Sequence, residues 1–227
     1  MDNIYHWLQS KGFEVTPCEE IETAFFHSSY INEHKSCKEN NERLEFVGDA
    51  VLQIYTTTRL YQIQPSLDEG QMTLFRSKLV SEPALAGYVR KLGINRYLKL
   101  GVGEEKTGGR ERDSILADLF EAFVGALYLT CGFAVVFQFL EMVIGGMFEN
   151  PKKILQDDYK TRLQEFIQSD SRKTVQYEVV HTSGPSNAPL FEVVVKLDER
   201  ILAEGKGTSK KRAEQEAAKN ALLKIAR

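Results

Sequence analysis

Apolar residues recur at three- and four-residue spacing through most of the first 150 residues, which predicts helices. The clearest stretches are residues 21–32, 41–60, 68–92 and 114–129. Clusters of glycine and charged residues separate them, and the cluster at residues 101–112 predicts a loop. The first part of the chain is therefore expected to be all-α.

The pattern changes after Pro151. Residues 155–169 have helical periodicity, whereas residues 175–181 and 190–197 alternate as strands do. A tight turn at residues 198–200 leads to a third strand at residues 201–206. A last helix, capped by Thr208 or Ser209, carries a stripe of mostly small residues that can pack closely on a sheet: Ala213, Ala217, Ala218, Ala221, Leu222 and Ile225. The order α-β-β-β-α predicts a small α+β domain.

A chain of 227 residues is long enough for two modest domains. The pair Gly145-Gly146 and the X-Pro step at Pro151 are typical of a helix end followed by a linker. We therefore expect a first domain at residues 1–150, a linker at residues 151–154 and a second domain at residues 155–227.

Charge differs between the two parts. Residues 1–150 hold 14 Lys+Arg and 21 Asp+Glu, a net charge of −7, whereas residues 151–227 hold 15 and 11, a net charge of +4. This segregation suggests that the basic part contacts a polyanion, and that the acidic part needs a cation to act on the same partner.

The cysteine usage and hydropathy favour a cytoplasmic protein. Three cysteines without CxxC spacing support neither a disulfide framework nor a thiolate zinc site. No run is expected to approach the roughly 18 uncharged apolar residues of a membrane span, and the start of the chain does not resemble a signal peptide. We therefore expect a soluble protein that does not contact a membrane.

Two apolar helical segments carry carboxylates. Residues 114–129 contain only two charges, Asp118 and Glu121, at i and i+3 on one helical face. In residues 41–52, Glu42, Glu45 and Asp49 fall within about 60° of one another at ~100° per residue. Gly48 would permit close approach of a second helix or a ligand. Burying an unpaired carboxylate is costly, so these groups need a partner.

A hard divalent cation is the partner that suits such groups best. If Glu45, Asp49, Asp118 and Glu121 converge, their repulsion favours Mg²⁺ or Mn²⁺, whose bound water can be activated as a nucleophile. A surface ion pair of Glu42 with Arg43 remains an alternative. A di-iron site is disfavoured because neither acidic helical segment carries a Glu-x-x-His pair, and no dinucleotide or P-loop motif indicates a small-molecule cofactor.

The segment Asn41-Glu42-Arg43-Leu44-Glu45-Phe46-Val47-Gly48-Asp49-Ala50-Val51-Leu52 resembles the signature helix of the ribonuclease III family. Residues 114–122 resemble the second acidic helix of that family, and the C-terminal part resembles a double-stranded RNA-binding domain. The resemblance thus covers essentially the whole chain. It implies the ribonuclease III fold for the first domain and the double-stranded RNA-binding fold for the second.

The resemblance also implies an activity. It implies that the protein is a homodimeric, Mg²⁺-dependent endonuclease that cuts duplex RNA. Its products would be 5′-phosphate and 3′-hydroxyl ends with a short 3′ overhang, and its substrates rRNA and other structured precursors. Position by position, the metal and catalytic carboxylates match Glu45, Asp49, Asp118 and Glu121, with Asp49 and Glu121 the most critical. Glu42 matches a further acid of the signature helix whose role is less direct. Glu69 matches an acid that helps bridge toward the partner's site.

The basic domain is expected to read duplex RNA through phosphates and 2′-hydroxyls in the minor groove. Three groups match the contacts of the resembling domain: Thr161, Gln164 and Gln168 on its first helix; Gly184, Pro185 and Asn187 in the loop between the first two strands; Lys210, Lys211 and Arg212 at the start of the last helix. Asn187 stands where this domain commonly has histidine.

Three points stay open from the sequence. The loop at residues 106–112 either holds substrate phosphates or is a mobile surface loop. One or two metals could serve each cut. A protein that binds duplex RNA without cutting it, or an RNA-maturation factor whose acids pair with basic proteins, are the rival hypotheses.

Overall fold

The computed structural model describes residues 3–34, 39–151, 159–170, 173–185 and 189–225 of the chain. Contacts within the chain divide it into two compact units, residues 1–151 (unit 1) and 152–227 (unit 2). The expected linker at residues 151–154 and the first residues of the expected second domain lie almost wholly outside the described residues.

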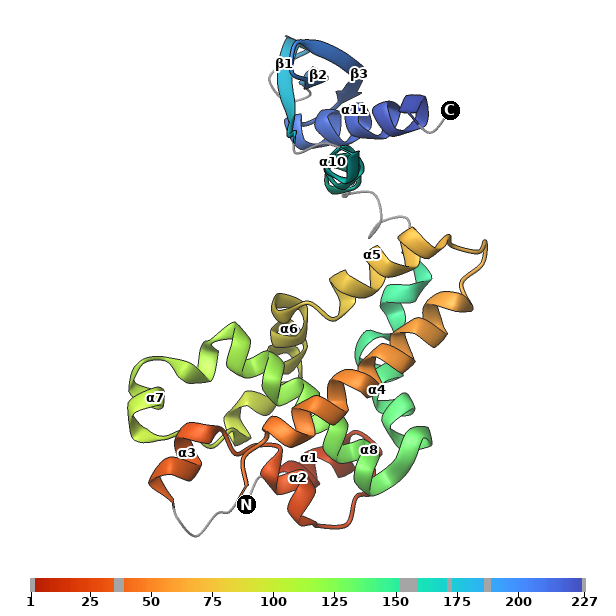
Figure 1. The fold of residues 1–227 in the computed structure, drawn as a ribbon. Coiled ribbons are helices and arrows are strands. Elements are labelled where there is room, and N and C mark those ends of the chain that lie inside the picture. The colour runs from red at the N-terminus through yellow and green to blue at the C-terminus, as the bar shows by residue number, and fades with distance from the viewer. Residues whose placement is uncertain (1–2, 35–38, 152–158, 171–172, 186–188, 226–227) are drawn as a thin grey trace. The chain divides into compact units, whose positions relative to one another are not determined.

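Unit 1 is helical, as expected (Figure 1). Its helices are α1 (Ile4–Ser10), α2 (Glu19–Thr23), α3 (Ser28–Glu33), α4 (Glu42–Tyr61), α5 (Glu69–Leu79), α6 (Glu82–Leu92), α7 (Val102–Lys106) and α8 (Asp113–Ile144). Short 3₁₀ turns lie at Ile94–Tyr97, Gly109–Glu111 and Gly145–Glu149. Helices α4 and α6 make the most extensive contacts with α8, which is therefore the centre of the unit.

The core of unit 1 forms around the apolar surface of α8. Leu119, Phe120 and Phe123 of this helix are fully buried. Phe123 packs edge-on against Trp7 of α1 and Phe139, with ring centroids 6.3 Å and 5.5 Å away. Such edge-to-face pairs stabilise a core beyond the area that they bury. A kink at Gly132, whose φ is 78°, lets the helix change direction between its two halves.

Helix α8 corrects the expectation about membranes. By length and composition alone, the segment Asp113–Glu149 is apolar enough to cross one. The segment was not expected because its 19 uncharged residues, from Ala122 to Leu140, run across the expected helix end. The core helix of a globular unit meets the same criterion, and the buried aromatic residues above show that α8 fills that role here.

Two expected helices are in fact pairs of helices. Residues 21–32 divide into α2 and α3, because Phe26 forms a bridge with Lys99 and His27 caps α3. Residues 68–92 divide into α5 and α6, because Ser81 is the N-cap of α6 and Pro83 lies in its first turn, where a missing N–H costs little. Periodicity alone runs across such breaks, since the apolar face continues on both sides.

The expected loop at residues 101–112 is also more regular than predicted, because it contains α7 and a 3₁₀ turn. Arg110 forms two bonds to the carboxylate of Glu105 and donates to the carbonyls of Asn95 and Leu98. Arg112 pairs with Glu104 at 2.6 Å. Both arginines therefore stabilise the local fold, which argues against the hypothesis that they are free to hold substrate phosphates.

Unit 2 has the expected order of elements: α10 (Tyr159–Asp170), β1 (Val175–Ser183), β2 (Leu190–Leu197), β3 (Arg200–Gly207) and α11 (Lys210–Ile225). The strands form an antiparallel sheet in the order β1-β2-β3, with Val195 opposite both Tyr177 and Ala203. The predicted turn between β2 and β3 is made by Asp198, whose φ is 53°.

The small residues of α11 lie on the sheet as the sequence predicted. Ala213, Ala217, Ala218 and Ala221 are fully buried. A Cβ on Gly205 of β3 would lie only 2.1 Å from the backbone nitrogen of Ala217, so this strand and the helix touch without an intervening side chain. Small residues on both sides therefore set the distance between α11 and β3.

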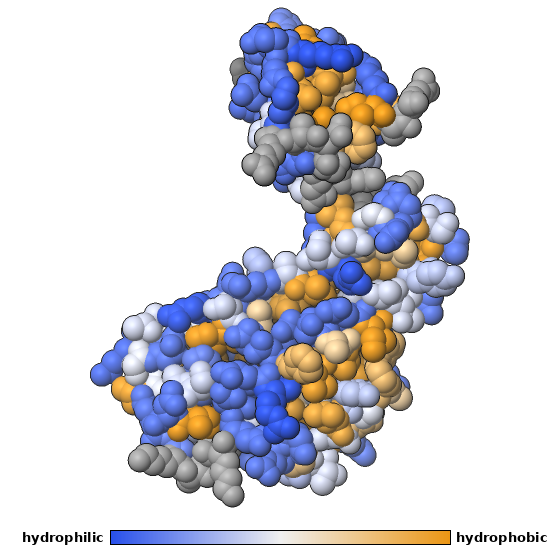
Figure 2. Space-filling model, viewed as in Figure 1, coloured by the Kyte–Doolittle hydropathy of each residue, from blue (hydrophilic) through white to orange (hydrophobic). Residues whose placement is uncertain are grey.

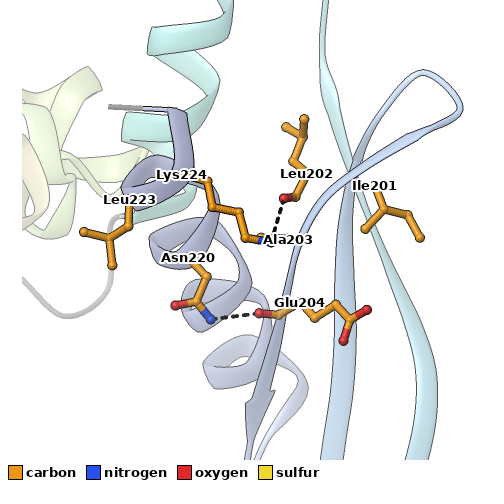
Figure 3. A pocket seen from close by; sticks show the side chains of 7 residues that line it. All are labelled: Ile201, Leu202, Ala203, Glu204, Asn220, Leu223 and Lys224. Carbon is orange, nitrogen blue, oxygen red and sulfur yellow. Dashed lines mark hydrogen bonds between the residues drawn. The ribbon is translucent and has the colours of Figure 1, made fainter. Parts of the chain in front are cut away.

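Strand β3 is at one edge of the sheet, and side chains of α11 bond to two of its backbone carbonyls (Figure 3). The side-chain amide of Asn220 donates to the carbonyl of Glu204 at 2.8 Å, and the ammonium of Lys224 donates to that of Leu202 at 3.4 Å. Exposed Ile201 and Leu223 line the groove beside these bonds. The two hydrogen bonds occupy acceptors that a further strand would need.

Candidate active site

The carboxylates of α4 and α8 are brought together by two glycines at the crossing of these helices (Figure 1). A Cβ on Gly48 would lie 1.8 Å from the carbonyl oxygen of Glu121, and a Cβ on Gly125 would lie 2.2 Å from that of Leu44. Real side chains do not fit at these distances, so the two backbones are in direct contact. The close approach predicted at Gly48 is therefore with a second helix.

This crossing gathers the predicted acids of both helices. Glu45, Asp49, Asp118 and Glu121 are all half-buried, whereas Glu42 is exposed. The amide of Gln53 donates to Oδ2 of Asp49 at 2.8 Å, which fixes one oxygen of that carboxylate one helical turn away. The structure thus places the predicted carboxylates in one partly desolvated cluster, which we call the acidic cluster: Glu42, Glu45, Asp49, Asp118 and Glu121.

Burial dominates the electrostatics of the acidic cluster. It raises the pKa of Glu121 to about 8, because a desolvated carboxylate is costly to ionise. Neighbouring negative charges add to this rise in the pKa of Glu121, namely Asp49, Glu45 and Asp118. Burial also raises the pKa of Glu45, with further contributions from Asp118, Glu42 and Asp49. The mutual influence shows that the acids of the two helices face a shared space.

Asp118 has two neighbours that the sequence did not predict. Burial raises the pKa of Asp118, the imidazole of His27 lowers it, and the carboxylates of Glu82 and Glu42 raise it. The sequence did not connect His27 with the cluster, because nothing in the spacing of residues 21–32 shows that the chain turns at residues 24–27. Glu82 begins α6, and no sequence signal connects it with the cluster.

Glu69 is placed apart from the acidic cluster. It is the first residue of α5, directly after the Asp68 capping box, and it is exposed. It does not appear among the charges that shift the pKa of Glu45, Asp118 or Glu121. Within one copy of the chain, the structure does not bring Glu69 to these acids.

The donor set of the acidic cluster suits a hard divalent cation, since it is made of carboxylate oxygens. As they stand, no three carboxylate, imidazole or thiol groups of the described residues are close enough together to hold one metal ion. No positively charged group of the described chain is among those that shift the pKa of Glu121, which burial and neighbouring carboxylates raise. A cation could supply that charge.

In unit 2, the predicted residues of α10 differ in their surroundings. Thr161 and Gln168 are exposed. Gln164 is half-buried, and its amide donates to the carbonyl of Lys173 at 3.1 Å and accepts from the N–H of Val175 at 3.0 Å. Both ends of this side chain thus connect α10 to the start of β1, so its groups serve the fold.

The two other predicted groups of unit 2 lie at a turn and a helix start. Gly184 has a φ of 88°, a conformation that favours glycine, and Pro185 follows it. Asn187 lies outside the described residues. Lys210, Lys211 and Arg212 are exposed in the first turn of α11, where the helix dipole adds to their positive charge. Arg212 also donates to the hydroxyl of Thr208 at 3.1 Å.

Comparisons with protein-family models agree with this division into two parts. Residues 19–146 match the family described as ribonuclease-III-like, and residues 159–225 match the double-stranded RNA binding motif. The first match contains the acidic cluster. The second contains all of the residues of unit 2 discussed above.

Curated proteins similar to this chain include ribonuclease 3 of Streptococcus mutans, which is 50% identical over 210 residues, 92% of this chain and 91% of that protein. Ribonuclease 3 of Streptococcus gordonii is 51% identical over 205 residues, 90% of this chain and 88% of that protein. Among solved structures, the nuclease domain of ribonuclease III from Campylobacter jejuni is similar, with a TM-score of 0.58 and 34% identity over 63% of this chain and 97% of that one. That structure is described as flexible in a region involved in dimer formation.

Proposed function

The chain belongs to the ribonuclease III family and is an endoribonuclease that acts on double-stranded RNA, and from this premise we propose that the acidic cluster is its catalytic centre. The observation that supports this proposal most directly is the Gly48–Gly125 crossing, which holds acids of two helices in one partly buried space. Desolvated, like-charged carboxylates are destabilising, so their presence in a stable fold favours a functional role.

We propose Mg²⁺ as the cofactor, with Mn²⁺ able to substitute. The carboxylates that would hold it are Glu45, Asp49, Asp118 and Glu121. When bound, such an ion supplies an activated water and stabilises the charge that develops on the phosphate oxygens. Because the described carboxylates do not share one ion as they stand, binding would have to draw them together.

Within this scheme, Glu121 and Asp49 have the most direct roles. A carboxyl with a pKa of about 8 holds a proton at neutral pH, and a cation in the cluster would displace it. Metal binding and proton release are therefore linked at Glu121. Gln53 keeps Oδ2 of Asp49 in a defined direction, so that its carboxylate is oriented before substrate arrives.

We further propose that the enzyme is a homodimer. One acidic cluster can cut one strand, and a two-fold axis supplies a second cluster for the other strand. The ring of Phe46, next to Glu45 on α4, is 81% exposed, and Leu129 and Phe133 of α8 are exposed as well. Figure 2 shows apolar residues gathered on unit 1 beside α4 and α8. An apolar surface of this kind favours burial against a second copy.

Unit 2 is proposed to bind the duplex. Thr161 and Gln168 would contact the minor groove, with Gln164 holding α10 in place behind them. The turn at Gly184 and Pro185, together with Asn187, would enter the next groove, and Lys210, Lys211 and Arg212 would contact phosphates. Glu69 would act across the dimer rather than in its own copy, since it lies apart from its own cluster.

We propose that the products carry 5′-phosphate and 3′-hydroxyl ends with a short 3′ overhang, that rRNA and other structured precursors are the substrates, and that the protein acts in the cytoplasm. The overhang follows from two cuts staggered across a groove by the dimer axis. These proposals rest on the family and on the site above.

A cleavage assay on a long RNA duplex tests the catalytic centre. The wild-type chain is expected to cut in Mg²⁺ and not in EDTA, and Glu121→Gln is expected to retain duplex binding without cutting. Glu14→Gln, which removes an exposed carboxylate elsewhere in unit 1, is the matched control and should cut normally. Normal cutting by Glu121→Gln would refute the assignment of the site.

A further inference from the structure

His27 is tied by its backbone to the segments that carry the acidic cluster. Its N–H donates to the carbonyl of Lys99 at 3.1 Å. The preceding carbonyl, that of Phe26, accepts from the N–H of Asn41 at 3.0 Å, and the carbonyl of Asn41 accepts from the N–H of Glu45. The position of His27 is therefore fixed relative to the first turn of α4, where Glu42 and Glu45 lie.

The imidazole of His27 is also oriented. Its Nδ1 accepts from the backbone N–H of Ser29 at 3.2 Å and lies 2.8 Å from the Ser29 hydroxyl, which in turn accepts from the N–H of Gly101. A backbone N–H can only donate, so Nδ1 is the acceptor. In the neutral imidazole the proton is then on Nε2. The N-cap of α3 thus determines which ring nitrogen is the donor.

The Nε2–H donor is left for another molecule. Among the described residues it has no hydrogen-bond acceptor, although the ring is close enough to Asp118 to interact with it electrostatically. His27 is also the only group in the described chain that lowers the pKa of any of Glu45, Asp118 and Glu121. Arg110 and Arg112, in the segment that precedes α8, are held in ion pairs of their own.

A phosphate that approaches an acidic cluster is repelled by it, so a donor at the rim of the cluster has a clear use. We propose that the Nε2–H of His27 donates a hydrogen bond to a phosphate oxygen of the RNA strand that is cut, and so holds that strand against the acidic cluster. The inference rests on the proposed function of the cluster and adds a substrate contact to it.

Two substitutions of His27 distinguish the loss of its Nε2–H donor from the loss of its role as the N-cap of α3. His27→Asn keeps an acceptor at the δ position, and asparagine is a favoured N-cap residue, but it has no group at the position of Nε2. His27→Gln loses the δ acceptor and keeps an N–H donor at the ε position. If the contact with phosphate is real, His27→Asn is stable but slow, whereas His27→Gln is less stable and cuts faster than His27→Asn.

The measurement is single-turnover cleavage of a duplex at saturating protein, with duplex affinity in EDTA and the melting temperature measured beside it. We expect His27→Asn to cut about 10- to 100-fold more slowly than wild type, the usual effect of losing one hydrogen bond to a charged group. Duplex affinity and melting temperature should remain close to wild type. His34→Asn, the same change at the exposed C-terminal end of α3, is the matched control and should cut normally.

Each outcome is decisive. Cutting at the wild-type rate by His27→Asn, or slow cutting by His27→Gln alone, would show that only the helix cap matters and would overturn the inference. Glu121→Gln is assayed in parallel. Should that variant cut, or should the wild-type chain fail to cut in Mg²⁺, the proposed catalytic centre fails and the inference fails with it. Slow cutting by His27→Asn, faster cutting by His27→Gln and no cutting by Glu121→Gln together support both the catalytic centre and the inference.

Discussion

Gly48 and Glu121 are in backbone contact, since the position of a Cβ on Gly48 lies 1.8 Å from the carbonyl oxygen of Glu121. Gly48→Ala must therefore push α4 away from α8 and displace the carboxylates on both. We expect a loss of at least about 2 kcal/mol in the free energy of unfolding, measured by urea denaturation, and a large loss of cleavage.

Gly87 provides the matched control for that substitution. It is also inside a helix, α6, but a Cβ there would meet nothing within 4 Å. Gly87→Ala should stabilise the protein by about 0.5–1 kcal/mol, because alanine loses less backbone entropy on folding than glycine. Equal effects of the two substitutions would contradict the close crossing.

The raised pKa of Glu121 predicts a pH dependence of stability in EDTA. The folded pKa of about 8 exceeds the unfolded value of 4.5, so the folded state retains the proton more strongly. Its contribution to stability is complete below pH 4.5 and is lost as the pH rises to 8. The melting temperature of the wild-type chain should therefore decline across this range.

Glu121→Gln removes that contribution to the pH dependence. At pH 8 in EDTA this variant should be more stable than wild type by roughly 2 kcal/mol, less than the full shift in pKa implies because the carboxyl is only partly buried. Mg²⁺ should raise the melting temperature of wild type more than that of the variant. Parallel pH profiles for the two proteins would argue against a desolvated Glu121.

Phe46 offers a test of the proposed dimer. Phe46→Ala removes a ring that is 81% exposed in one copy of the chain, and an aromatic residue at the centre of an interface commonly contributes about 2 kcal/mol to association. We expect the dimer dissociation constant, measured by analytical ultracentrifugation, to rise roughly 30-fold. Tyr61→Ala, which removes a ring that is 78% exposed at the far end of α4, should leave it unchanged.

The first turn of α11 offers a test of duplex binding. Replacing both Lys210 and Lys211 by alanine should weaken binding about 10- to 100-fold near 0.1 M salt, because two phosphate contacts and the counterions that they release are lost. The slope of log affinity against log salt should fall in magnitude by about 2. Lys219→Ala, later on the same helix and paired with Glu216, should change the slope little. An unchanged slope in the double variant would place the phosphate contacts elsewhere.

The sequence predicted the two acidic helices well, because both have a long apolar stripe in which carboxylates are conspicuous. It also predicted that α11 would lie close to the sheet, since Ala213, Ala217, Ala218 and Ala221 form a stripe of small side chains along one face of the helix. In each case the prediction depended on residues within a single element.

What the sequence did not show depends on contacts between elements. The break at residues 24–27 is made by hydrogen bonds to Lys99 and Asn41, which are distant in the chain, and the nearness of His27 to Asp118 follows from that break. Gly125 resembles any helical glycine until its contact with Leu44 is seen. The predicted role of Gln164 likewise takes no account of its two bonds to the start of β1.

The bonds from Asn220 and Lys224 to the outer carbonyls of β3 matter when many copies of the chain lie close together. A long RNA duplex can carry many copies of this chain side by side, at a local concentration far above that of the surrounding solution. Under such conditions an uncovered strand recruits strands from its neighbours and starts aggregation. Because side chains of α11 already satisfy these carbonyls, copies of unit 2 can stand close together on one RNA without joining their sheets along that edge.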